Sequence, residues 1–399
     1  MDRADSASTT DIQRSTLELA KELIACRSIT PDDGGGMDLI ASRLAKCGFD
    51  YERMDRGKPA YRVRNLWARH GSETPIVCLA GHVDVVPPGD VDRWTTDPFE
   101  PTERDGRLIG RGAADMKTSV AAMITAAERF VAARPDHEGS LALLLTSDEE
   151  GLARDGTCAV VQQLQWRNET MDACILGEPT STSVLGDTIK NGRRGSLSGV
   201  VVVRGAQCHI GYPERGLNPI HMGIPALAEL ASIEWDTGND DFPPTTFQIS
   251  HVHASTGANN TIPGTLEVWL NFRYSPESTE DELTRRVVAV LDAHGVDYRL
   301  EWMSKGAPFL SPQGRLVDVV SAAVTSVTGV EPRLSTSGGT SDGRFLSAVS
   351  REIVEFGPVG ASAHAIDEHV LLADLGPLSE IYEQALGSLL PNPSSGRGS

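Results

Sequence analysis

The sequence predicts an α/β protein, in which a mostly parallel sheet is flanked by helices and a smaller α+β domain is inserted into the chain. Two observations lead to this prediction. In the first part, apolar runs typical of buried strands alternate with segments of helical periodicity. In the middle, the predicted order becomes β-α-β-β-α-β, which is typical of a ferredoxin-like sandwich. Because 399 residues exceed what one core usually serves, we expect a main domain formed by 1–192 and 306–399, and an inserted domain at 193–305.

The elements of the main domain have strong local signals. The run 140–146 reads Ser-Leu-Ala-Leu-Leu-Leu-Thr, an uninterrupted apolar stretch typical of a strand covered on both faces. A helix predicted at 38–47 ends where Gly48 follows, because glycine suits the end of a helix. The predicted strands are 65–68, 76–80, 140–146, 173–176 and 352–356, and the predicted helices are 15–25, 38–47, 118–132, 157–164, 316–328 and 373–390. Residues 391–399 are predicted to form a disordered tail.

The inserted domain is predicted from a change of pattern after residue 192. Residues 196–204 alternate and are rich in β-branched side chains, which favours a strand with one buried face. The further strands are predicted at 247–252, 265–274 and 297–303, and the helices at 219–231 and 279–294.

Composition limits the classes of partner. The chain has 36 basic and 55 acidic residues and a net charge of −19, which argues against nucleic acid or an anionic membrane as the main partner. An anionic small molecule stays possible, because a few local arginines can override the overall field. Residues 1–11 are polar, the six cysteines form no C-x-x-C pair, and no segment reaches the about 18 apolar residues of a membrane span. We therefore expect a cytoplasmic protein.

Polar residues follow the ends of several predicted strands. His82 and Asp84 follow the strand at 76–80, and residues two apart on an extended chain point to the same side. A carboxylate beside a metal-bound imidazole takes the far ring N–H and fixes its tautomer. The other candidates follow later strands and turns and are Asp115, Glu149, Glu150, Glu178 and His364.

Each candidate alone has an ordinary explanation. Asp115 could cap the helix at 118–132, the adjacent acids Glu149 and Glu150 could form a solvated turn, and His364 could be a surface histidine. Together they place two imidazoles and several carboxylates at one edge of the sheet, where the acids would repel one another unless cations lay among them. Two divalent metals need about this set: one histidine and one carboxylate each, a bridging carboxylate, and a further carboxylate that takes a proton from water.

With these motifs the chain resembles the M20 metallopeptidases, which have a di-zinc aminopeptidase-like core. The resemblance runs from the helix around Ala20 to Leu390 and rests on the segments 81–87, 110–118, 146–150, 177–180, 189–196, 260–264 and 337–345. The first, third and fourth of these mark the superfamily. The second, fifth and last favour the branch that removes a succinyl group from a diamino diacid over acetylornithine deacetylase and aminoacylase relatives.

The resemblance implies a centre of two zinc ions, which cobalt can replace. The implied ligands are His82, Asp115, Glu150, Glu178 and His364. His82 and Glu178 would hold one ion, Glu150 and His364 the other, and Asp115 would bridge both. Asp84 would support His82, Glu149 would be the general base, and the peptide bond after Asp115 would be cis.

The resemblance also implies a small-molecule substrate with several carboxylates. The implied substrate-binding residues are Arg193, Asn260, Arg273, Gly339 and Thr340, and arginine suits this role because its planar fork gives a carboxylate two hydrogen bonds. The inserted domain would be a dimerisation domain, so we expect a homodimer in which His209 reaches the partner's site. Cys208 stands where the family usually has glycine, which puts the local backbone in question.

Two alternatives stay open at this point. One is another M20 deacylase or carboxypeptidase, for example an enzyme like acetylornithine deacetylase. The other is a catalytically inactive scaffold on the same fold. The presence of all five ligand positions and of Glu149 argues against the scaffold.

Overall fold

The computed structural model describes residues 8–392, and the chain divides into two compact units. The first unit runs to Gly192 and includes Ser311–Ser335 and the chain from Ser341 onward. The second comprises Arg193–Leu310 and Thr336–Thr340, and so extends beyond the boundary expected at 305. Most of the predicted tail, 393–399, lies outside the described residues.

The first unit is built on an eight-stranded sheet in the order β1-β4-β8-β5-β9-β20-β10-β19. The strands are β1 (Asp50–Arg53), β4 (Asn65–His70), β8 (Ser140–Thr146), β5 (Ile76–His82), β9 (Met171–Leu176), β20 (Ser350–Glu355), β10 (Thr188–Lys190) and β19 (Arg333–Ser335). The neighbours β8, β5, β9 and β20 pair in parallel, while β4 pairs with β8 in the antiparallel direction. All residues of β5 and β8 are buried, as expected for central strands covered on both faces.

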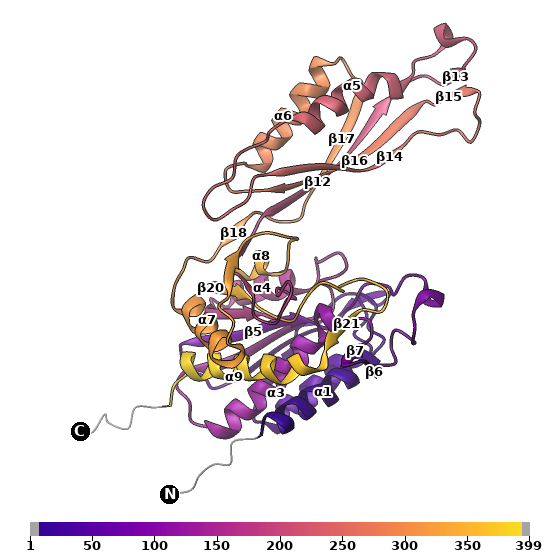
Figure 1. The fold of residues 1–399 in the computed structure, drawn as a ribbon. Helices are drawn as coiled ribbons and strands as arrows, with labels where there is room; N and C mark the ends of the chain where they lie inside the picture. Colours follow the sequence, from indigo (N-terminus) through magenta and orange to yellow (C-terminus); the bar gives the residue numbers. More distant parts are fainter. Residues whose placement is uncertain (1–7, 393–399) are drawn as a thin grey trace, which may run out of the picture. The chain divides into compact units, whose positions relative to one another are not determined.

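Helices cover this sheet. They are α1 (Thr9–Ala25), α2 (Gly36–Lys46), α3 (Thr118–Ala133), α4 (Thr157–Trp166), α7 (Arg315–Thr328), α8 (Gly343–Leu346) and α9 (Leu375–Leu389). The long helices α1, α3 and α9 pack against one another on one face, whereas α4 and α8 lie on the other (Figure 1). Their apolar side chains form one large core with the strands, so the first unit is an α/β layer structure.

Short elements fill the edges of the first unit. They are the hairpin β2 (Arg56–Lys58) and β3 (Tyr61–Val63), and a three-stranded sheet of β21 (His369–Leu371), β7 (Arg107–Ile109) and β6 (Thr102–Arg104). An irregular π-helical turn, η2 (Ala113–Lys117), leads into α3. Among residues 8–392, none of the helices combines the length and apolar character that a membrane span needs.

The second unit is an antiparallel sheet in the order β14-β16-β12-β17, with two helices packed on it. Its strands are β12 (Gly195–Arg204), β14 (Thr246–His253), β16 (Thr265–Tyr274) and β17 (Tyr298–Ser304), and its helices are α5 (Pro219–Ser232) and α6 (Glu280–Ala293). In β16 buried residues alternate with more exposed ones, as the period of a strand with one covered face requires. The predicted order β-α-β-β-α-β is observed.

Candidate metal centre

The candidate ligands gather where parallel strands end. His82 is the last residue of β5, Glu149 and Glu150 follow β8, and Glu178 follows β9. Since β5 pairs in parallel with both β8 and β9, their carboxyl ends meet at the same edge of the sheet, where α/β proteins place their sites.

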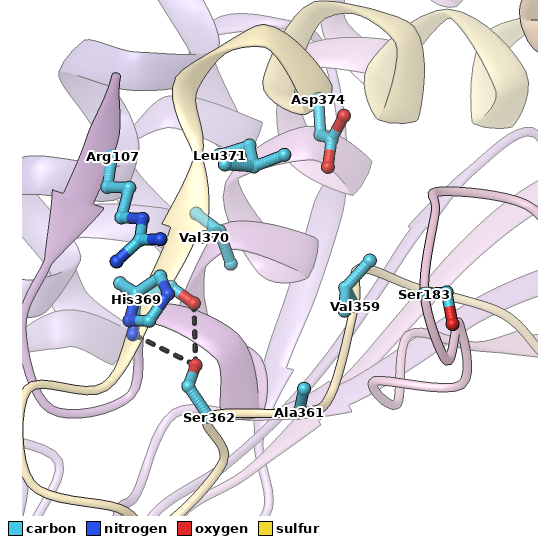
Figure 2. A pocket seen from close by; sticks show the side chains of 9 residues that line it. All are labelled: Arg107, Ser183, Val359, Ala361, Ser362, His369, Val370, Leu371 and Asp374. Atoms are coloured by element: carbon cyan, nitrogen blue, oxygen red, sulfur yellow. Dashed lines mark hydrogen bonds between the residues drawn. The ribbon is translucent and has the colours of Figure 1, made fainter. Parts of the chain in front are cut away.

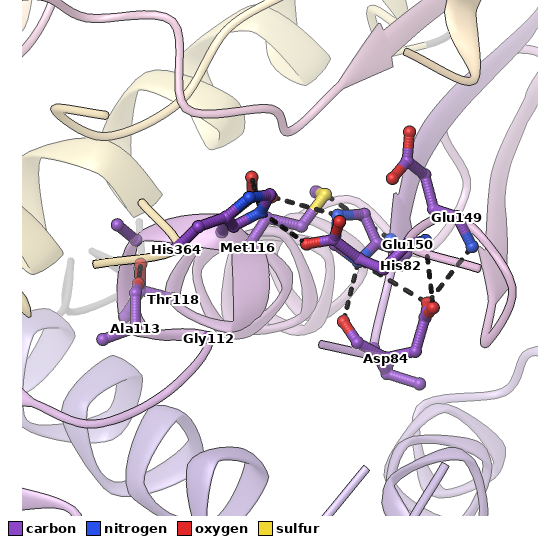
Figure 3. Close-up of polar contacts among 12 residues, drawn as sticks. His82, Asp84, Gly112, Ala113, Met116, Thr118, Glu149, Glu150 and His364 are labelled. Carbon is purple, nitrogen blue, oxygen red and sulfur yellow. Dashed lines mark hydrogen bonds and ion pairs between the residues drawn. The ribbon is translucent and has the colours of Figure 1, made fainter. Parts of the chain in front are cut away.

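Asp115 lies between two histidines. Its Oδ1 is 3.1 Å from His82 Nε2, and its Oδ2 is 3.3 Å from His364 Nε2. His364 Nε2 is also 2.8 Å from Glu150 Oε1 (Figure 3). Ligand atoms of His82, Asp115 and Glu150 all lie within 4.8 Å of one another. Because each oxygen of Asp115 faces a different imidazole, the arrangement has the shape that a carboxylate bridging two cations requires.

The backbone around Asp115 is irregular. The Asp115–Met116 peptide bond is cis, as expected. The dihedral angles of Asp115 are φ −122° and ψ 97°, outside the helical region. The N-cap position of α3 belongs to Lys117, so Asp115 does not cap this helix. Gly81 matters here, because a Cβ atom at this position would collide with the Met116 methyl group.

The electrostatics of the cluster favour positive charge between the acids. Hydrogen bonds to Asp115 and Glu150 raise the pKa of His364 to about 10. Burial disfavours charge on His82, but the hydrogen bond and charge of Asp115, with the charge of Asp84, raise its pKa well above the usual value. Although burial disfavours its charge, the same two imidazoles hold the pKa of Asp115 well below its ordinary range. Imidazole nitrogens and carboxylate oxygens are also the ligands that zinc prefers, so this donor set fits divalent cations.

We expected the carboxylate of Asp84 to take the far ring N–H of His82, but the main-chain oxygen of Asp84 lies closer to that ring. His82 Nδ1 is 2.9 Å from the main-chain oxygen of Asp84, while the Asp84 carboxylate is 3.6 Å away. That carboxylate accepts hydrogen bonds from the N–H groups of Glu149 (3.3 Å) and Glu150 (3.1 Å). Burial raises the pKa of Asp84 to about 6. Asp84 therefore orients His82 through its backbone and fixes the turn after β8 through its side chain.

Glu149 and Glu178 lie close enough to influence each other. Burial, and then the charges of Glu178 and Asp342, raise the pKa of Glu149 well above its ordinary value. Glu178 is buried, and within the described part of the chain it stands outside the group of His82, Asp115 and Glu150.

Sequence reasoning missed two residues behind the cluster, Arg111 and Glu368. They form a fully buried ion pair, with Arg111 Nη1 2.5 Å from Glu368 Oε2. Glu368 also accepts N–H groups of the turn that carries Asp115. The one hint in the sequence was that Glu368 lies four residues after the candidate ligand His364. Nothing in a single sequence connects Glu368 with a turn that precedes it by more than 250 residues.

The predicted substrate residues lie in the second unit. His209 is in β13 (Cys208–His209), which pairs with β15 (Thr261–Ile262), and the carbonyl of Asn260 accepts the N–H of Ile210 at 2.9 Å. His209 and Asn260 are therefore brought together. Cys208 lies in a short strand, a conformation open to any residue, so the absence of glycine there does not disturb the backbone.

The arginines of the predicted set are held separately. Arg193 Nη1 donates to the carbonyls of Ser337 (3.5 Å) and Gly339 (3.3 Å). It therefore contacts the turn that carries Gly339 and Thr340. Arg273 lies in β16, opposite Ser196 of β12 and Thr246 of β14.

A separate pocket of about 240 Å³ lies beside the loop that carries His364 (Figure 2). It is lined by Arg107, Ser183, Val359, Ala361, Ser362, His369, Val370, Leu371 and Asp374. Ser362 Oγ donates to the carbonyl of His369 (2.7 Å) and accepts its N–H (3.0 Å), so these bonds close the base of the loop. None of the predicted site residues line this pocket.

Comparison with known proteins agrees with this picture. The model of the peptidase family M20/M25/M40 matches residues 78–388. A succinyl-diaminopimelate desuccinylase of Aromatoleum aromaticum is 59% identical over 94% of this chain and 97% of that protein. One of Thiobacillus denitrificans is 57% identical over 94% and 95%.

Solved structures show the same fold. An M20 family metallo-carboxypeptidase of Sulfolobus solfataricus, Sso-CP2, superimposes with a TM-score of 0.78 at 16% identity, covering 93% of this chain and 98% of that one. The YXEP protein of Bacillus subtilis, described as a dinuclear metal binding peptidase, gives a TM-score of 0.69 at 15% identity and covers 95% and 98%. The family match over most of the chain, together with these relatives, shows that the chain belongs to the peptidase family M20/M25/M40.

Proposed function

We propose that the protein is a metal-dependent amide hydrolase that cleaves N-succinyl-LL-2,6-diaminopimelate to succinate and LL-2,6-diaminopimelate, a step of lysine and diaminopimelate biosynthesis. The observation that carries the proposal is the sharing of Asp115 between His82 and His364. It is found in a chain with six relatives at 54–59% identity that all bear the name succinyl-diaminopimelate desuccinylase.

The metal ions of the proposed centre are two zincs, for which cobalt can substitute. His82 and Glu178 would hold one, Glu150 and His364 the other, and Asp115 both. The acids that raise the pKa values of the two histidines support this, because negative charge that favours a protonated imidazole also favours a bound cation. Zinc, when bound, would lower the pKa of water and polarise the amide carbonyl.

Glu149 is the proposed general base. One of its carboxylate oxygens would take a proton from the attacking water and then give it to the amine nitrogen as the C–N bond breaks. Succinate then leaves as the acid part and the amine as the other product. The raised pKa of Glu149 supports this role, because the side chain must keep the proton between the two steps. Asp84 would hold Glu149 in place through the backbone N–H of that residue.

The substrate contacts in the proposal belong to the second unit. They are Arg193, Asn260, Arg273, Gly339 and Thr340, with His209 as a donor to the developing negative charge on the carbonyl oxygen. The contact of Arg193 with the carbonyl of Gly339 supports a common role for that arginine and the turn. A substrate with several carboxylates needs several such donors.

The second unit is also the proposed dimerisation unit. Large apolar side chains on it are exposed, among them Val252 (57%) and Trp269 (46%), which fits a surface that a second copy covers. In this dimer His209 of one copy would serve the site of the other.

Mixing inactive Glu149→Gln chains with inactive His209→Ala chains under subunit exchange creates one site without either change in each mixed dimer. Activity should then return; mixed dimers without activity would contradict the shared site.

The decisive experiment for the function is a hydrolysis assay. The purified protein, freed of metal and then given zinc, is offered N-succinyl-diaminopimelate and, in parallel, N-acetylornithine and a dipeptide. Preference for the succinyl substrate, dependent on zinc, supports the proposal. Preference for either of the other two would assign the chain to another M20 activity, and no hydrolysis with both metals loaded would make it an inactive scaffold.

A further inference from the structure

Two segments far apart in the sequence meet behind the metal centre. One is the turn of residues 112–115, which ends in Asp115. The other, here called the His364 loop, is formed by residues 362–368. The ion pair of Arg111 and Glu368 joins them, and both side chains are buried, 2% and 0% exposed. A charged pair so deep in the protein must be compensated by further hydrogen bonds.

Glu368 holds the turn. Its Oε1 accepts the N–H groups of Ala114 and Asp115, each at 2.9 Å, and its Oε2 accepts the N–H of Gly112 at 3.1 Å. The carboxylate therefore collects three backbone donors of this turn, those of Gly112, Ala114 and Asp115. In this way Glu368 fixes the backbone from which the Asp115 side chain extends.

Arg111 holds the loop. Its Nη1 donates to the carbonyl of Ala365 and its Nη2 to the carbonyl of His364, both at 3.3 Å. His364 has a φ of +63°, in the left-handed region that L-residues rarely adopt, so its conformation depends on such external contacts. The guanidinium itself lies 5.2 Å from the ring of Trp94, which covers it.

We propose that Arg111 and Glu368 are positioning residues that set the separation of Asp115 and His364 and thereby the metal affinity of the centre. The inference rests on the proposed metal site and on no other part of the proposed function. Neither residue is assigned a contact with metal or substrate. Their effect passes through the backbone of the turn and of the His364 loop.

The chemistry of the contacts selects the variants. Glu368→Gln keeps the shape but replaces one acceptor by an N–H₂ donor, which must then face either the backbone N–H groups or Arg111. Arg111→Lys keeps the charge but loses the planar fork that reaches Glu368 and the loop carbonyls together. Asp236→Asn and Arg43→Lys are matched controls. Asp236 accepts N–H and O–H groups of a loop in the second unit, and Arg43 forms a two-bond pair with Glu128 away from the metal cluster.

The test measures zinc affinity by competition with a chromophoric chelator, together with thermal unfolding of the metal-free proteins. Loss of a residue that orients a metal ligand typically lowers metal affinity 10–100-fold. We expect a loss of this size in both variants and parent-like affinity in both controls. A millimolar excess of zinc should restore turnover in the two variants, because neither residue takes part in the reaction.

Three results would overturn the inference: parent-like zinc affinity in both variants, an equal loss in the controls, or turnover that excess zinc does not restore. If Glu368→Gln does not fold, Arg111→Lys decides by the same criteria, since it retains the buried charge. A parent protein that binds zinc but does not cleave the succinyl substrate would refute the proposed function and leave this inference standing.

Discussion

Replacement of Glu149 by glutamine separates the role of a base from that of a ligand. Within residues 8–392 the Glu149 carboxylate makes no hydrogen bond, so the change removes a titrating group without breaking a contact. Burial and the charges of Glu178 and Asp342 raise its pKa well above the ordinary value. The glutamine therefore resembles the protonated side chain in shape and charge.

The expected effect on the reaction is large. General base catalysis by a positioned side chain contributes about 10²–10⁴-fold, which corresponds to about 3–5 kcal/mol in the barrier. Hydrolysis by Glu149→Gln should fall by this factor, while the zinc content stays at the value of the parent. Steady-state kinetics and metal analysis of the same preparation measure both quantities.

Whereas the hydrolysis rate should fall in Glu149→Gln, the stability of the metal-free protein should rise. A raised pKa in the folded state means that the folded protein keeps a proton that the unfolded chain, with a pKa of about 4.3, has lost. The parent therefore loses stability as the pH rises from about 4.3 toward the raised folded pKa. Glu149→Gln has no such loss, so its metal-free form should unfold at a higher temperature than the parent at pH 8.

A matched change at Glu150 serves as the control. Glu150 Oε1 is 2.8 Å from His364 Nε2, so Glu150→Gln should lower zinc content. If Glu149→Gln loses zinc while Glu150→Gln keeps it, the two roles are interchanged and the argument from the geometry fails. A metal-free Glu149→Gln protein less stable than the parent at pH 8 would refute the electrostatic reasoning.

Three further outcomes are expected. His364→Ala removes the nitrogen that faces both Asp115 and Glu150 and should bind about one zinc fewer, as metal analysis would show; full zinc content would contradict its role. Asp84→Asn leaves the N–H groups of the turn after β8 without a charged acceptor and should lower zinc affinity about 10–100-fold, measured by chelator competition, whereas an unchanged affinity would speak against it. Burial, and then the charge of His137, lower the pKa of His70, so stability should be lost as the pH falls below about 6.5, the value of a free histidine. Thermal unfolding from pH 7 to 5 should show this loss in the parent and less of it in His70→Asn, and equal slopes would refute it.

The central strands could be predicted because their signal is local and strong. The run at 140–146 is apolar throughout, and β8 spans the same residues with every one buried. The short edge strands were missed because their residues are polar and exposed: β2 reads Arg-Gly-Lys, and all three residues are exposed. Such strands form through pairing with a neighbour, which a single sequence does not show.

The features of the site likewise divide into those that the sequence could predict and those that it could not. The carboxyl ends of parallel strands lie at one edge of a sheet, so the predicted topology places His82, Glu149 and Glu178 together. The structure has them at that edge. The sequence could not show which atom of Asp84 meets His82, because the main-chain and side-chain oxygens of one residue are equally near in sequence.

Asp84 and Glu368 act by the same physical means, although only Asp84 could be anticipated. Each is a buried carboxylate that accepts backbone N–H groups from one ligand-bearing turn. Each is also tied to the segment of a second ligand: Asp84 to His82 through its main-chain oxygen, and Glu368 to His364 through Arg111. A carboxylate can accept hydrogen bonds from several donors in fixed directions. A buried carboxylate left without such donors would strongly destabilise the folded protein. The ligand turns are therefore held by groups that need the same hydrogen bonds for their own solvation.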